Sequence, residues 1–299
     1  MHEIVVISGK GGTGKTTITG AFAAIVKNKV IADCDVDAAD LHLLLKPEVK
    51  ESQEFWCGQV AYIDRGRCME CNLCTDICRF NAIHNYVVDP IACEGCGFCA
   101  RVCAVDAISM DNNLSGHIYK SATKYGSFVH ARLGIAQENS GKLVTQVRQM
   151  AKDMAKKESA DYLICDGSPG IGCPVIASLI GVDLALVITE PTLSGIHDME
   201  RVIEVCQKLD TGVVVAINKY DINEANSRQI ESYCQETGIK IIGKIPYDIS
   251  VNRALANGKT IAEYPGSKAC SEIEKIWHNL TDELEDKRLA SLNIGGKGE

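Results

Sequence analysis

The chain has 299 residues, of which 46% are apolar, and a formal net charge of −8 at pH 7. This length and apolar content are enough for one large domain and a small one. The acidic balance argues against a surface that neutralises nucleic-acid phosphates, and no apolar run approaches the roughly 18 residues that cross a bilayer.

Fifteen cysteines are the most unusual feature of the composition. Met1-His2-Glu3 runs directly into an apolar stretch at residues 4–7, without the pattern of a signal peptide. We therefore expect a cytoplasmic protein. In such reducing surroundings, clustered thiols are metal ligands more often than disulfides.

Short β-rich runs alternate with helical stretches along most of the chain. The runs are nearly continuous in apolar residues, which is typical of parallel strands buried on both faces. The expected strands are residues 4–8, 30–32, 60–63, 162–165, 184–189, 213–218 and 239–245. Helical spacing marks residues 16–26, 143–157, 199–209, 224–236 and 269–289. This alternation predicts an α/β fold with a doubly wound, mostly parallel sheet.

A glycine-rich loop follows the first expected strand. Residues 9–16 read G-K-G-G-T-G-K-T and open a helix, which is the setting that a phosphate-binding loop requires. Lys15 would contact the β- and γ-phosphates, and the Thr16 hydroxyl would bind Mg²⁺. The nucleotide-binding residues predicted in and after this loop are Gly9, Lys10, Gly11, Gly12, Thr13, Gly14, Lys15, Thr16 and Thr17.

The second lysine of the loop carries more information than the first. Residues 10–16 match K-G-G-x-G-K-S/T, and this variant resembles the loop of the MinD/ParA family of P-loop ATPases. In that family the early lysine crosses a dimer interface to the partner's nucleotide. The resemblance therefore implies that Lys10 acts in trans and that ATP closes a homodimer. The alternative is a solvated loop lysine.

Two aspartate motifs extend the resemblance. Asp33-Cys34-Asp35 ends the second expected strand and resembles switch I, which implies that Asp35 orients the attacking water and supports Mg²⁺, with Asp33 assisting. Asp166, followed by G-S-P-G, resembles the Walker B aspartate near Mg²⁺. The implied catalytic residues are Lys10, Lys15, Asp35 and Asp166, and the implied Mg²⁺ ligands are Thr16, Asp35 and Asp166.

Two further segments concern the base. Residues 245–248 read I-P-Y-D, where the family lays backbone against the base, so the resemblance implies contacts by Pro246 and Tyr247. Asn218 begins N-K-x-D, which in GTPases reads guanine through the aspartate. In the MinD/ParA group the asparagine alone contacts adenine. ATP is favoured on this ground, and GTP is the alternative.

The alternation of strands and helices stops between residues 64 and 115. Eight cysteines there form two copies of C-x2-C-x2-C-x3-C, the second 25 positions after the first. This spacing holds [4Fe–4S] clusters in bacterial ferredoxins, where the fourth cysteine of each run ligates the other cluster. We expect cluster 1 on Cys68, Cys71, Cys74 and Cys103, and cluster 2 on Cys93, Cys96, Cys99 and Cys78.

Other interpretations of the cysteines remain. Zinc also binds C-x2-C pairs, although the repeated run of four favours iron. The usual proline after the fourth cysteine is replaced by Arg79 and Ala104. The cysteines outside the repeat are interpreted mainly as small core residues. Cys173 lies where related dimeric ATPases project cluster ligands, yet a core position is favoured for it too.

The predicted domains follow from these motifs. Residues 1–63 and 116–290 would form the ATPase domain, residues 64–115 an inserted α+β ferredoxin-like domain, and residues 291–299 a flexible tail. At about 50 residues the insert has too little apolar material for a core, so the clusters themselves would hold it together.

The whole pattern looks like MinD-superfamily ATPases that carry an inserted ferredoxin domain. We expect an ATP-hydrolysing iron–sulfur protein that couples a dimer switch to its clusters, for metallocluster assembly or for electron delivery to a protein partner. The alternatives are a spatial-organisation ATPase of the partitioning type and a ferredoxin-type carrier with a merely regulatory nucleotide domain. Because the expected helix at 269–289 is acidic, neither nucleic-acid binding nor membrane insertion is expected.

Overall fold

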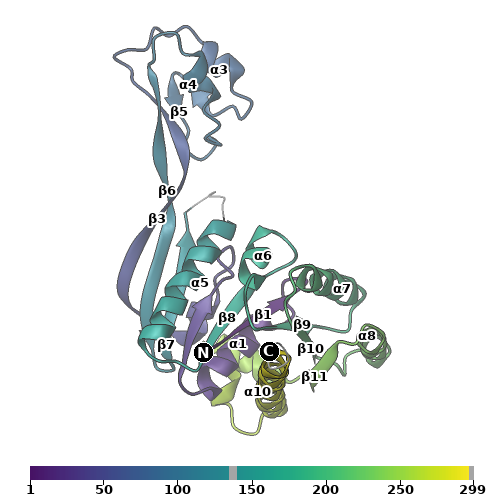
Figure 1. Cartoon of the computed structure of the whole chain (residues 1–299). Helices are drawn as coiled ribbons and strands as arrows, with labels where there is room; N and C mark the ends of the chain where they lie inside the picture. Colours follow the sequence, from purple (N-terminus) through teal and green to yellow (C-terminus); the bar gives the residue numbers. More distant parts are fainter. Residues whose placement is uncertain (135–139, 296–299) are drawn as a thin grey trace. The chain divides into compact units, whose positions relative to one another are not determined.

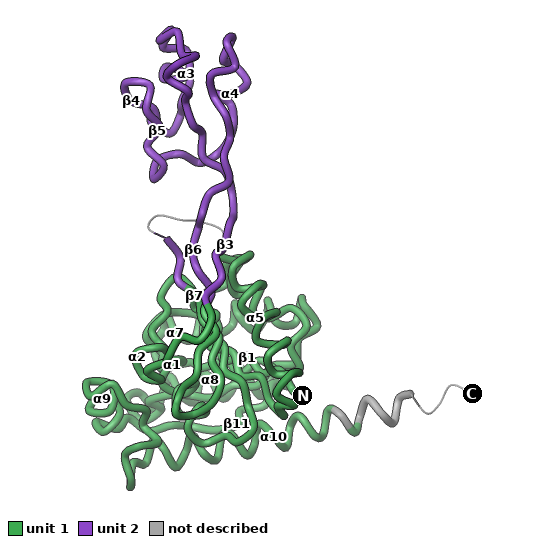
Figure 2. Tube along the Cα trace, turned by 90° about the vertical axis from the view of Figure 1, so that its left-hand side faces the viewer, with its two compact units in different colours: residues 1–51, 119–131, 140–299 green, residues 52–118, 132–139 purple. Residues whose placement is uncertain are grey.

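A computed structural model describes residues 1–134 and 140–295 (Figure 1). The chain divides into two compact units, coloured separately in Figure 2. Unit 1 comprises Met1–Glu51, Tyr119–Ala131 and Ser140–Glu299, and unit 2 comprises Ser52–Ile118 and Arg132–Asn139. These bounds differ from the expected insert at 64–115. The reason is that two strands, β3 (Glu48–Ile63) and β6 (Ile108–Thr123), contain residues of both units.

The main sheet has nine strands in the order β11-β10-β9-β1-β8-β2-β7-β6-β3. Its pairs from β11 to β7 are parallel. The strands not yet given are β1 (His2–Ser8), β2 (Lys29–Asp33), β7 (Gly126–Leu133), β8 (Tyr162–Pro169), β9 (Leu184–Thr189), β10 (Val213–Asn218) and β11 (Lys240–Ile245). Every strand expected from the sequence is present, and the bounds of β9 and β10 are the expected ones.

Two strands of the main sheet, β6 and β7, were not expected, and neither was the short pair at residues 83–84 and 87–88. The sequence offers no continuous apolar run for β6 or β7, because both strands are only partly buried and polar residues interrupt them. A two-residue turn, Lys124-Tyr125, joins them, and such a turn connects neighbouring strands that run in opposite directions. β3 is also far longer than the expected 60–63, since its first seven residues are exposed and carry no apolar signal.

The helices cover both faces of the sheet. The crossover through α1 (Lys15–Ile25) leads from β1 towards β2, whereas those through α5 (Ser140–Lys157), α6 (Cys173–Leu179), α7 (Leu193–Lys208) and α8 (Glu224–Glu236) lead the other way along the strand order. Because parallel crossovers are right-handed, opposite directions place helices on opposite faces. α2 (Leu41–Leu45), α10 (Lys268–Gly295) and the short helix η1 (Ile261–Glu263) pack with α1, and α9 (Ile249–Ala256) contacts η1.

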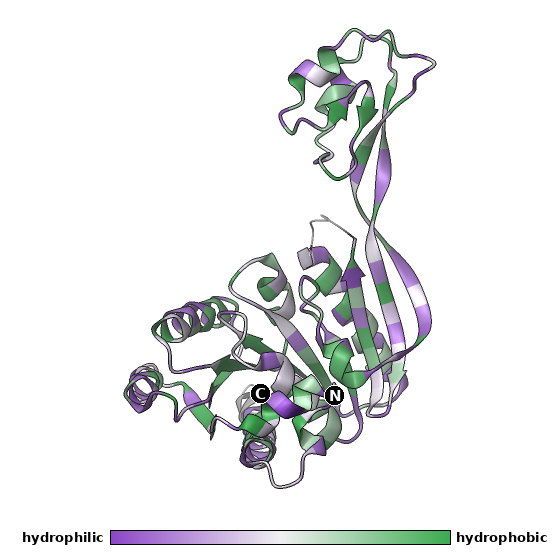
Figure 3. Ribbon diagram, turned by 180° about the vertical axis from the view of Figure 1, so that it is seen from behind, coloured by the Kyte–Doolittle hydropathy of each residue, from purple (hydrophilic) through white to green (hydrophobic). Residues whose placement is uncertain are grey.

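A large buried cluster lies between α1, α10 and the sheet. Phe22 of α1 meets Trp277 of α10 with ring centroids 5.2 Å apart, and Ile4 and Ile164 belong to the same cluster. Figure 3 shows the apolar colour concentrated along the central strands. α10 continues to Gly295, so the expected tail does not begin at residue 291, and residues 296–299 lie outside the described part of the chain.

Unit 2 contains α3 (Leu73–Ile77), α4 (Phe98–Val102) and a small antiparallel pair, β4 (Ile83–His84) with β5 (Val87–Val88). Its own buried cluster is small and consists of Ile63, Cys74 and Ile83, with further cysteines packed against it. So few buried residues make a weak core, which agrees with the expectation that something besides apolar packing stabilises this unit.

The Asp248 carboxylate fastens the start of α9 to the start of α10. It accepts hydrogen bonds from the Ser250 N–H and hydroxyl, the Ser267 hydroxyl and the Ala269 N–H. Partial burial opposes ionisation, but these donors outweigh it and hold the pKa of Asp248 below its usual range. The stabilisation is therefore present above the unfolded pKa, near pH 4, and is lost as the pH falls below that value.

We predict that Asp248→Ala lowers the free energy of unfolding by about 1–2 kcal/mol at pH 7, because a helix cap and its hydrogen bonds are lost. The difference from the parent chain should shrink towards pH 3. Urea unfolding at both pH values measures it, with Asp282→Ala on exposed α10 surface as the control. An equal loss at both pH values would contradict the role of the ionised carboxylate.

Candidate functional site

The carboxyl ends of the parallel strands meet at one edge of the main sheet, and the predicted nucleotide residues follow them. The glycine-rich loop connects β1 to α1, and Gly14 takes φ 95° at the start of that helix. A Cβ atom on Gly14 would lie 2.3 Å from Asn218 Nδ2, so this position requires glycine. α1 begins at Lys15, and the N–H groups at a helix N-terminus favour a phosphate.

Lys15 is buried among carboxylates. Its Nζ atom lies 2.9 Å from Asp35 Oδ2 and 3.5 Å from Asp166 Oδ1. Burial alone would lower the pKa of Lys15, but the charges of Asp166 and Asp35 outweigh it and raise the pKa. The ammonium therefore keeps its charge, and a bound phosphate would compete with the two carboxylates for it.

The site has more carboxylates than cations. Asp33, Asp35 and Asp166 surround the single ammonium of Lys15, and burial, helped by the charge of Asp166, raises the pKa of Asp33 well above its usual range. Among the described residues, neither Asp33 Oδ2 nor Asp166 Oδ2 has a hydrogen-bond partner, although both are buried. Such oxygens are costly to leave unpaired, and a hydrated Mg²⁺ would satisfy them. The donor set fits the predicted ion.

A cavity of about 390 Å³ opens beside the loop. Its polar wall includes Gly11, Gly12, Thr13, Gly14, Lys15, Thr16, Thr17 and Asp35. Its apolar wall includes Ile245, Val251 and Leu255, from the end of β11 and from α9. One end is thus suited to phosphates and the other to a flat apolar ring. The lining contains Ile245 rather than the expected Pro246 and Tyr247, which follow it.

The base end of the cavity bears on the choice between adenine and guanine. Asn218 Nδ2 donates to the Thr13 carbonyl oxygen at 2.7 Å, which ties this loop to the phosphate loop. The Asp221 carboxylate accepts the Tyr247 backbone N–H at 2.7 Å. A carboxylate oxygen that is already engaged in this way has less capacity to accept the donors of guanine, which favours adenine.

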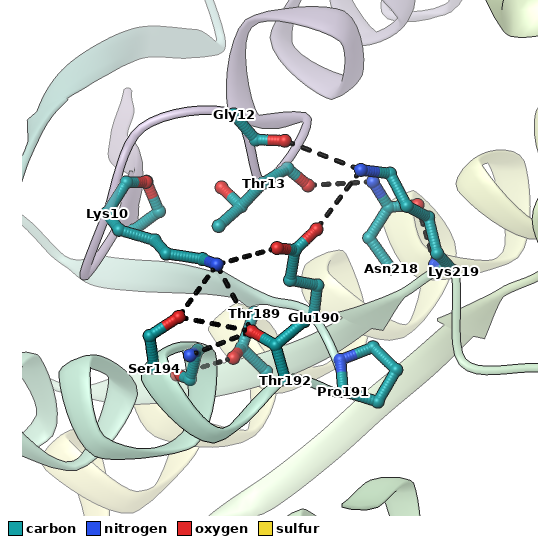
Figure 4. A network of polar contacts seen from close by, with 12 residues as sticks. Lys10, Gly12, Thr13, Thr189, Glu190, Pro191, Thr192, Ser194, Asn218 and Lys219 are labelled. Atoms are coloured by element: carbon teal, nitrogen blue, oxygen red, sulfur yellow. Dashed lines mark hydrogen bonds and ion pairs between the residues drawn. The ribbon is translucent and has the colours of Figure 1, made fainter. Parts of the chain in front are cut away.

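Figure 4 shows where Lys10 lies. Its Nζ atom is 2.7 Å from Glu190 Oε1 and within 3.1 Å of both the Thr192 and the Ser194 hydroxyl oxygens, at the start of α7. Glu190 Oε2 is also 3.1 Å from Lys219 Nζ. Within one chain, Lys10 is therefore held by its own protomer and does not line the cavity described above.

The sequence did not single out Glu190, Thr19 or Ser168, and the structure places all three in the site. Thr19 Oγ1 donates to Asp166 Oδ1 at 3.0 Å, and Ser168 Oγ donates to the Cys34 carbonyl oxygen. One signal was available for Glu190: it is a polar residue directly after a buried parallel strand, where ligand-binding residues of such sheets gather. Thr19 lies one helical turn after Lys15, and its sequence carries no comparable signal.

In unit 2, the eight repeated cysteines line two cavities, four at each. One cavity of about 30 Å³ is lined by Cys68, Cys71, Cys74 and Cys103. The other, of about 480 Å³, is lined by Cys93, Cys96, Cys99 and Cys78. No group of three or more His, Cys, Asp or Glu side chains in the described residues converges as around a single metal ion. A cubane differs from a single ion because each of its ligands binds a separate iron.

The two cysteine runs share one backbone conformation. Helices α3 and α4 are offset by the 25 positions of the repeat, and so are the left-handed pairs Glu70 with Gly95 and Asn72 with Gly97. The Ala82 N–H donates to Cys78 Sγ at 3.4 Å, and its counterpart, the Ala107 N–H, donates to Cys103 Sγ at 3.3 Å. The fourth sulfur of each run is thus oriented in the same way, and the four cysteines at each cavity are the donor set that a [4Fe–4S] cubane requires.

The cysteines outside the repeat differ in burial, and Cys57 and Cys270 are partly buried. Cys34, Cys165, Cys206 and Cys234 are buried, as expected for small core residues. Cys173 is exposed, so the interpretation as a core residue was wrong for it. The reason is its position as the first residue of α6, where the chain has just left the sheet.

Comparison with known protein families identifies one match. The family model described as "CobQ/CobB/MinD/ParA nucleotide binding domain" matches residues 4–261. The chain belongs to this family.

Other members are similar over nearly the whole chain. A Methanocaldococcus jannaschii protein, MJ0578, is 34% identical over 283 residues, which cover 94% of this chain and 96% of the relative. An iron-sulfur cluster carrier protein of Pyrococcus abyssi is 24% identical over 96% of this chain and 89% of the relative. A chain in the structure of the MinC:MinD cell division protein complex of Aquifex aeolicus is 18% identical, with a TM-score of 0.58. The match covers 94% of this chain and 96% of that chain.

Membership in the CobQ/CobB/MinD/ParA family confirms two predictions. The fold is the mostly parallel α/β sheet of a P-loop NTPase, and the protein is a P-loop ATPase. No helix in the described residues has both the length and the apolar character to cross a membrane.

For hydrolysis we predict unequal effects of two of the site aspartates, Asp166 and Asp33. Asp166→Asn should lower kcat at least 100-fold, because it removes charge from the proposed Mg²⁺ site. Asp33→Asn should lower it less than 10-fold, because burial raises the pKa of Asp33 and so weakens its hold on a negative charge. Phosphate release at saturating Mg²⁺-ATP measures both. Equal losses would show that Asp33 also acts as a charged ligand.

Proposed function

We propose that this ATPase is an iron–sulfur protein in which ATP controls a dimer of two-cluster subunits, for metallocluster assembly or for electron delivery to a partner. The observation that carries the proposal is the grouping of the eight repeated cysteines at two cavities, four at each, with the fourth cysteine exchanged between the runs. Two clusters on such quartets would make residues 64–115 a ferredoxin-like domain.

On the cluster side, the proposed ligands are Cys68, Cys71, Cys74 and Cys103 for cluster 1, and Cys93, Cys96, Cys99 and Cys78 for cluster 2. The backbone N–H groups of Ala82 and Ala107 would stabilise the thiolate charge of the exchanged ligands. When bound, a [4Fe–4S] cluster supplies one-electron transfer or serves as cargo. Iron is favoured over zinc because both quartets follow one repeated backbone pattern.

On the nucleotide side, Lys15 and the backbone of residues 9–17 would hold the phosphates of ATP, and Thr16, Asp35 and Asp166 would hold Mg²⁺. The unpartnered Asp166 Oδ2 supports this assignment. Asp35 would orient the attacking water. Asn218 would meet adenine, and the engagement of Asp221 by Tyr247 favours ATP over GTP.

Lys10 would act across a homodimer. To do so, it must leave Glu190 and the hydroxyl groups of Thr192 and Ser194. Glu190 would then still be paired with Lys219, which limits the cost of the exchange. These three contacts support the proposal that Lys10 is inactive in the single chain. In the dimer, contacts of Lys10 with the partner's nucleotide would replace them.

The relatives named as iron-sulfur cluster carriers support cluster transfer to a protein acceptor, whereas ferredoxin-type cysteine runs support electron transfer. A cytoplasmic location suits either role. The partitioning-type alternative has less support, because exposed residues of the described α10 surface include Glu274, Asp282 and Glu285. Transfer of labile clusters to an apo-acceptor would distinguish the first role, and stable clusters that are reduced and reoxidised would distinguish the second.

We predict that anaerobic reconstitution gives about eight irons and eight sulfides per chain, with the EPR signal of reduced [4Fe–4S] clusters. Cys78→Ser and Cys103→Ser should each lose about four irons, because each removes one ligand of one cluster. Cys173→Ser is the control and should keep all of them. A protein that binds zinc and contains no sulfide would contradict the iron assignment. An EPR signal that does not change with ATP would show that nucleotide binding and the clusters are not coupled.

We also predict that Glu190→Gln lowers the ATP concentration needed for dimer formation by about 2- to 10-fold, as expected for the loss of a partly exposed charge pair of up to about 1.4 kcal/mol. Lys10→Ala should abolish the ATP-dependent dimer. Analytical ultracentrifugation across an ATP titration measures both, with Glu204→Gln on α7 as the control. A higher ATP requirement in Glu190→Gln would mean that Glu190 supports the dimer.

A further inference from the structure

The two cysteine quartets of unit 2 are related by the 25-residue repeat, yet their surroundings differ. Corresponding positions of the repeat line both cavities, which allows a comparison residue by residue. Met69 and Ala104 line the first cavity where Glu94 and Arg79 line the second. The first cavity is thus more apolar, and the second has two charged side chains in its wall.

The quartets also differ in burial and in room. Cys74 is 8% exposed, whereas Cys99, its counterpart, is only partly buried. The cavity beside Cys74 measures about 30 Å³, and the cavity beside Cys99 measures about 480 Å³. Water and small solutes therefore reach the second quartet more readily than the first.

A single tyrosine braces the first cysteine loop. The Tyr86 hydroxyl lies 2.9 Å from the Glu70 carbonyl oxygen and 2.6 Å from Asn72 Oδ1, between the first and third cysteines of the run. The Arg65 guanidinium lies over the Tyr86 ring, 5.5 Å from its centroid, and its Nη1 atom is 3.8 Å from Glu70 Oε1. These side-chain contacts therefore connect the loop that carries Cys68, Cys71 and Cys74 to the turn between β4 and β5.

The second loop lacks this brace. Its residues at the positions of Glu70 and Asn72 are Gly95 and Gly97, which offer no side chain to bind. The residue 25 positions after Tyr86 is Asp111, which accepts a hydrogen bond from Ser109 on its own strand. Gly95 instead lies against the backbone of β3, where a Cβ atom would be 2.2 Å from the Gln59 carbonyl oxygen. Close backbone packing positions this loop without enclosing its sulfurs.

From these differences we propose that the two cluster sites have unequal lability: the site of Cys93, Cys96, Cys99 and Cys78 exchanges its cluster with solution or an acceptor, and the Tyr86-braced site of Cys68, Cys71, Cys74 and Cys103 retains its cluster. Tyr86 is a positioning residue in this scheme, because it acts through the loop and touches no iron. The inference rests on the proposed two-cluster function and adds a division of roles to it.

The test begins with holo-protein that contains about eight irons per chain, so that a failure of the two-cluster proposal is seen before the chase starts. Anaerobic addition of an excess of a ferrous chelator should release iron in two phases of similar amplitude, with rates at least 5-fold apart. Samples quenched after the first phase are alkylated with iodoacetamide and mapped by mass spectrometry. Cys93, Cys96, Cys99 and Cys78 should be modified first.

Tyr86→Phe tests the brace. It removes the hydroxyl and keeps the ring beneath Arg65, so we expect the slow phase to accelerate at least 3-fold and the fast phase to stay unchanged. Tyr62→Phe, at an exposed position of β3, is the matched control and should change neither phase. A single phase, earlier modification of the first quartet, or a Tyr86→Phe effect on the fast phase alone would each overturn the proposal. The alkylation map needs no variant and keeps the test valid if Tyr86→Phe binds iron poorly.

Discussion

The nucleotide site depends on one imbalance of charge. Lys15 supplies one ammonium to Asp33, Asp35 and Asp166, all of which lie at the carboxyl edge of the main sheet. Burial makes the imbalance expensive, because two carboxylate oxygens lack partners among the described residues. A bound phosphate group would draw Lys15 away from Asp35, and a divalent cation would then neutralise the aspartates. Because β1, β8 and β2 are parallel neighbours in the sheet, the lysine and the aspartates that follow them meet at their carboxyl ends.

The same logic explains the position of Lys10. In the single chain, a carboxylate and two hydroxyl groups hold this lysine outside the nucleotide cavity, and the carboxylate is shared with Lys219. Partial burial opposes ionisation of Glu190, but its hydrogen bonds with Lys10 and Lys219 outweigh it and hold the pKa of Glu190 below its usual range. The carboxylate is therefore charged at neutral pH, and the resting arrangement is ionic and exchangeable. In the proposed dimer, the phosphates of the nucleotide bound to the partner subunit would replace this contact.

Unit 2 follows a different principle. Its buried cluster is too small to stabilise about 70 residues by apolar packing, and the cysteine quartets lie where a core would otherwise be. Metal binding and folding would then be coupled in this unit, as in other small metal-dependent domains. The duplicated backbone makes two similar sites, and substitutions at matching positions, such as Tyr86 and Asp111, make them unequal.

The sequence by itself determined the ATPase fold and the positions of most of its site residues. Continuous apolar runs predicted the parallel strands of the main sheet other than β7, and the loop at residues 9–16 predicted the place of Lys15, because these signals are local in the chain. It also predicted two sets of cluster ligands, through a rule on the exchange of Cys78 and Cys103, and each set lines one cavity. It missed β6, β7 and most of β3, whose partly exposed residues carry no continuous apolar pattern. Only the tertiary structure revealed Glu190 beside Lys10 and Tyr86 on the first cysteine loop, because contacts between residues far apart in the chain leave no mark on the local sequence.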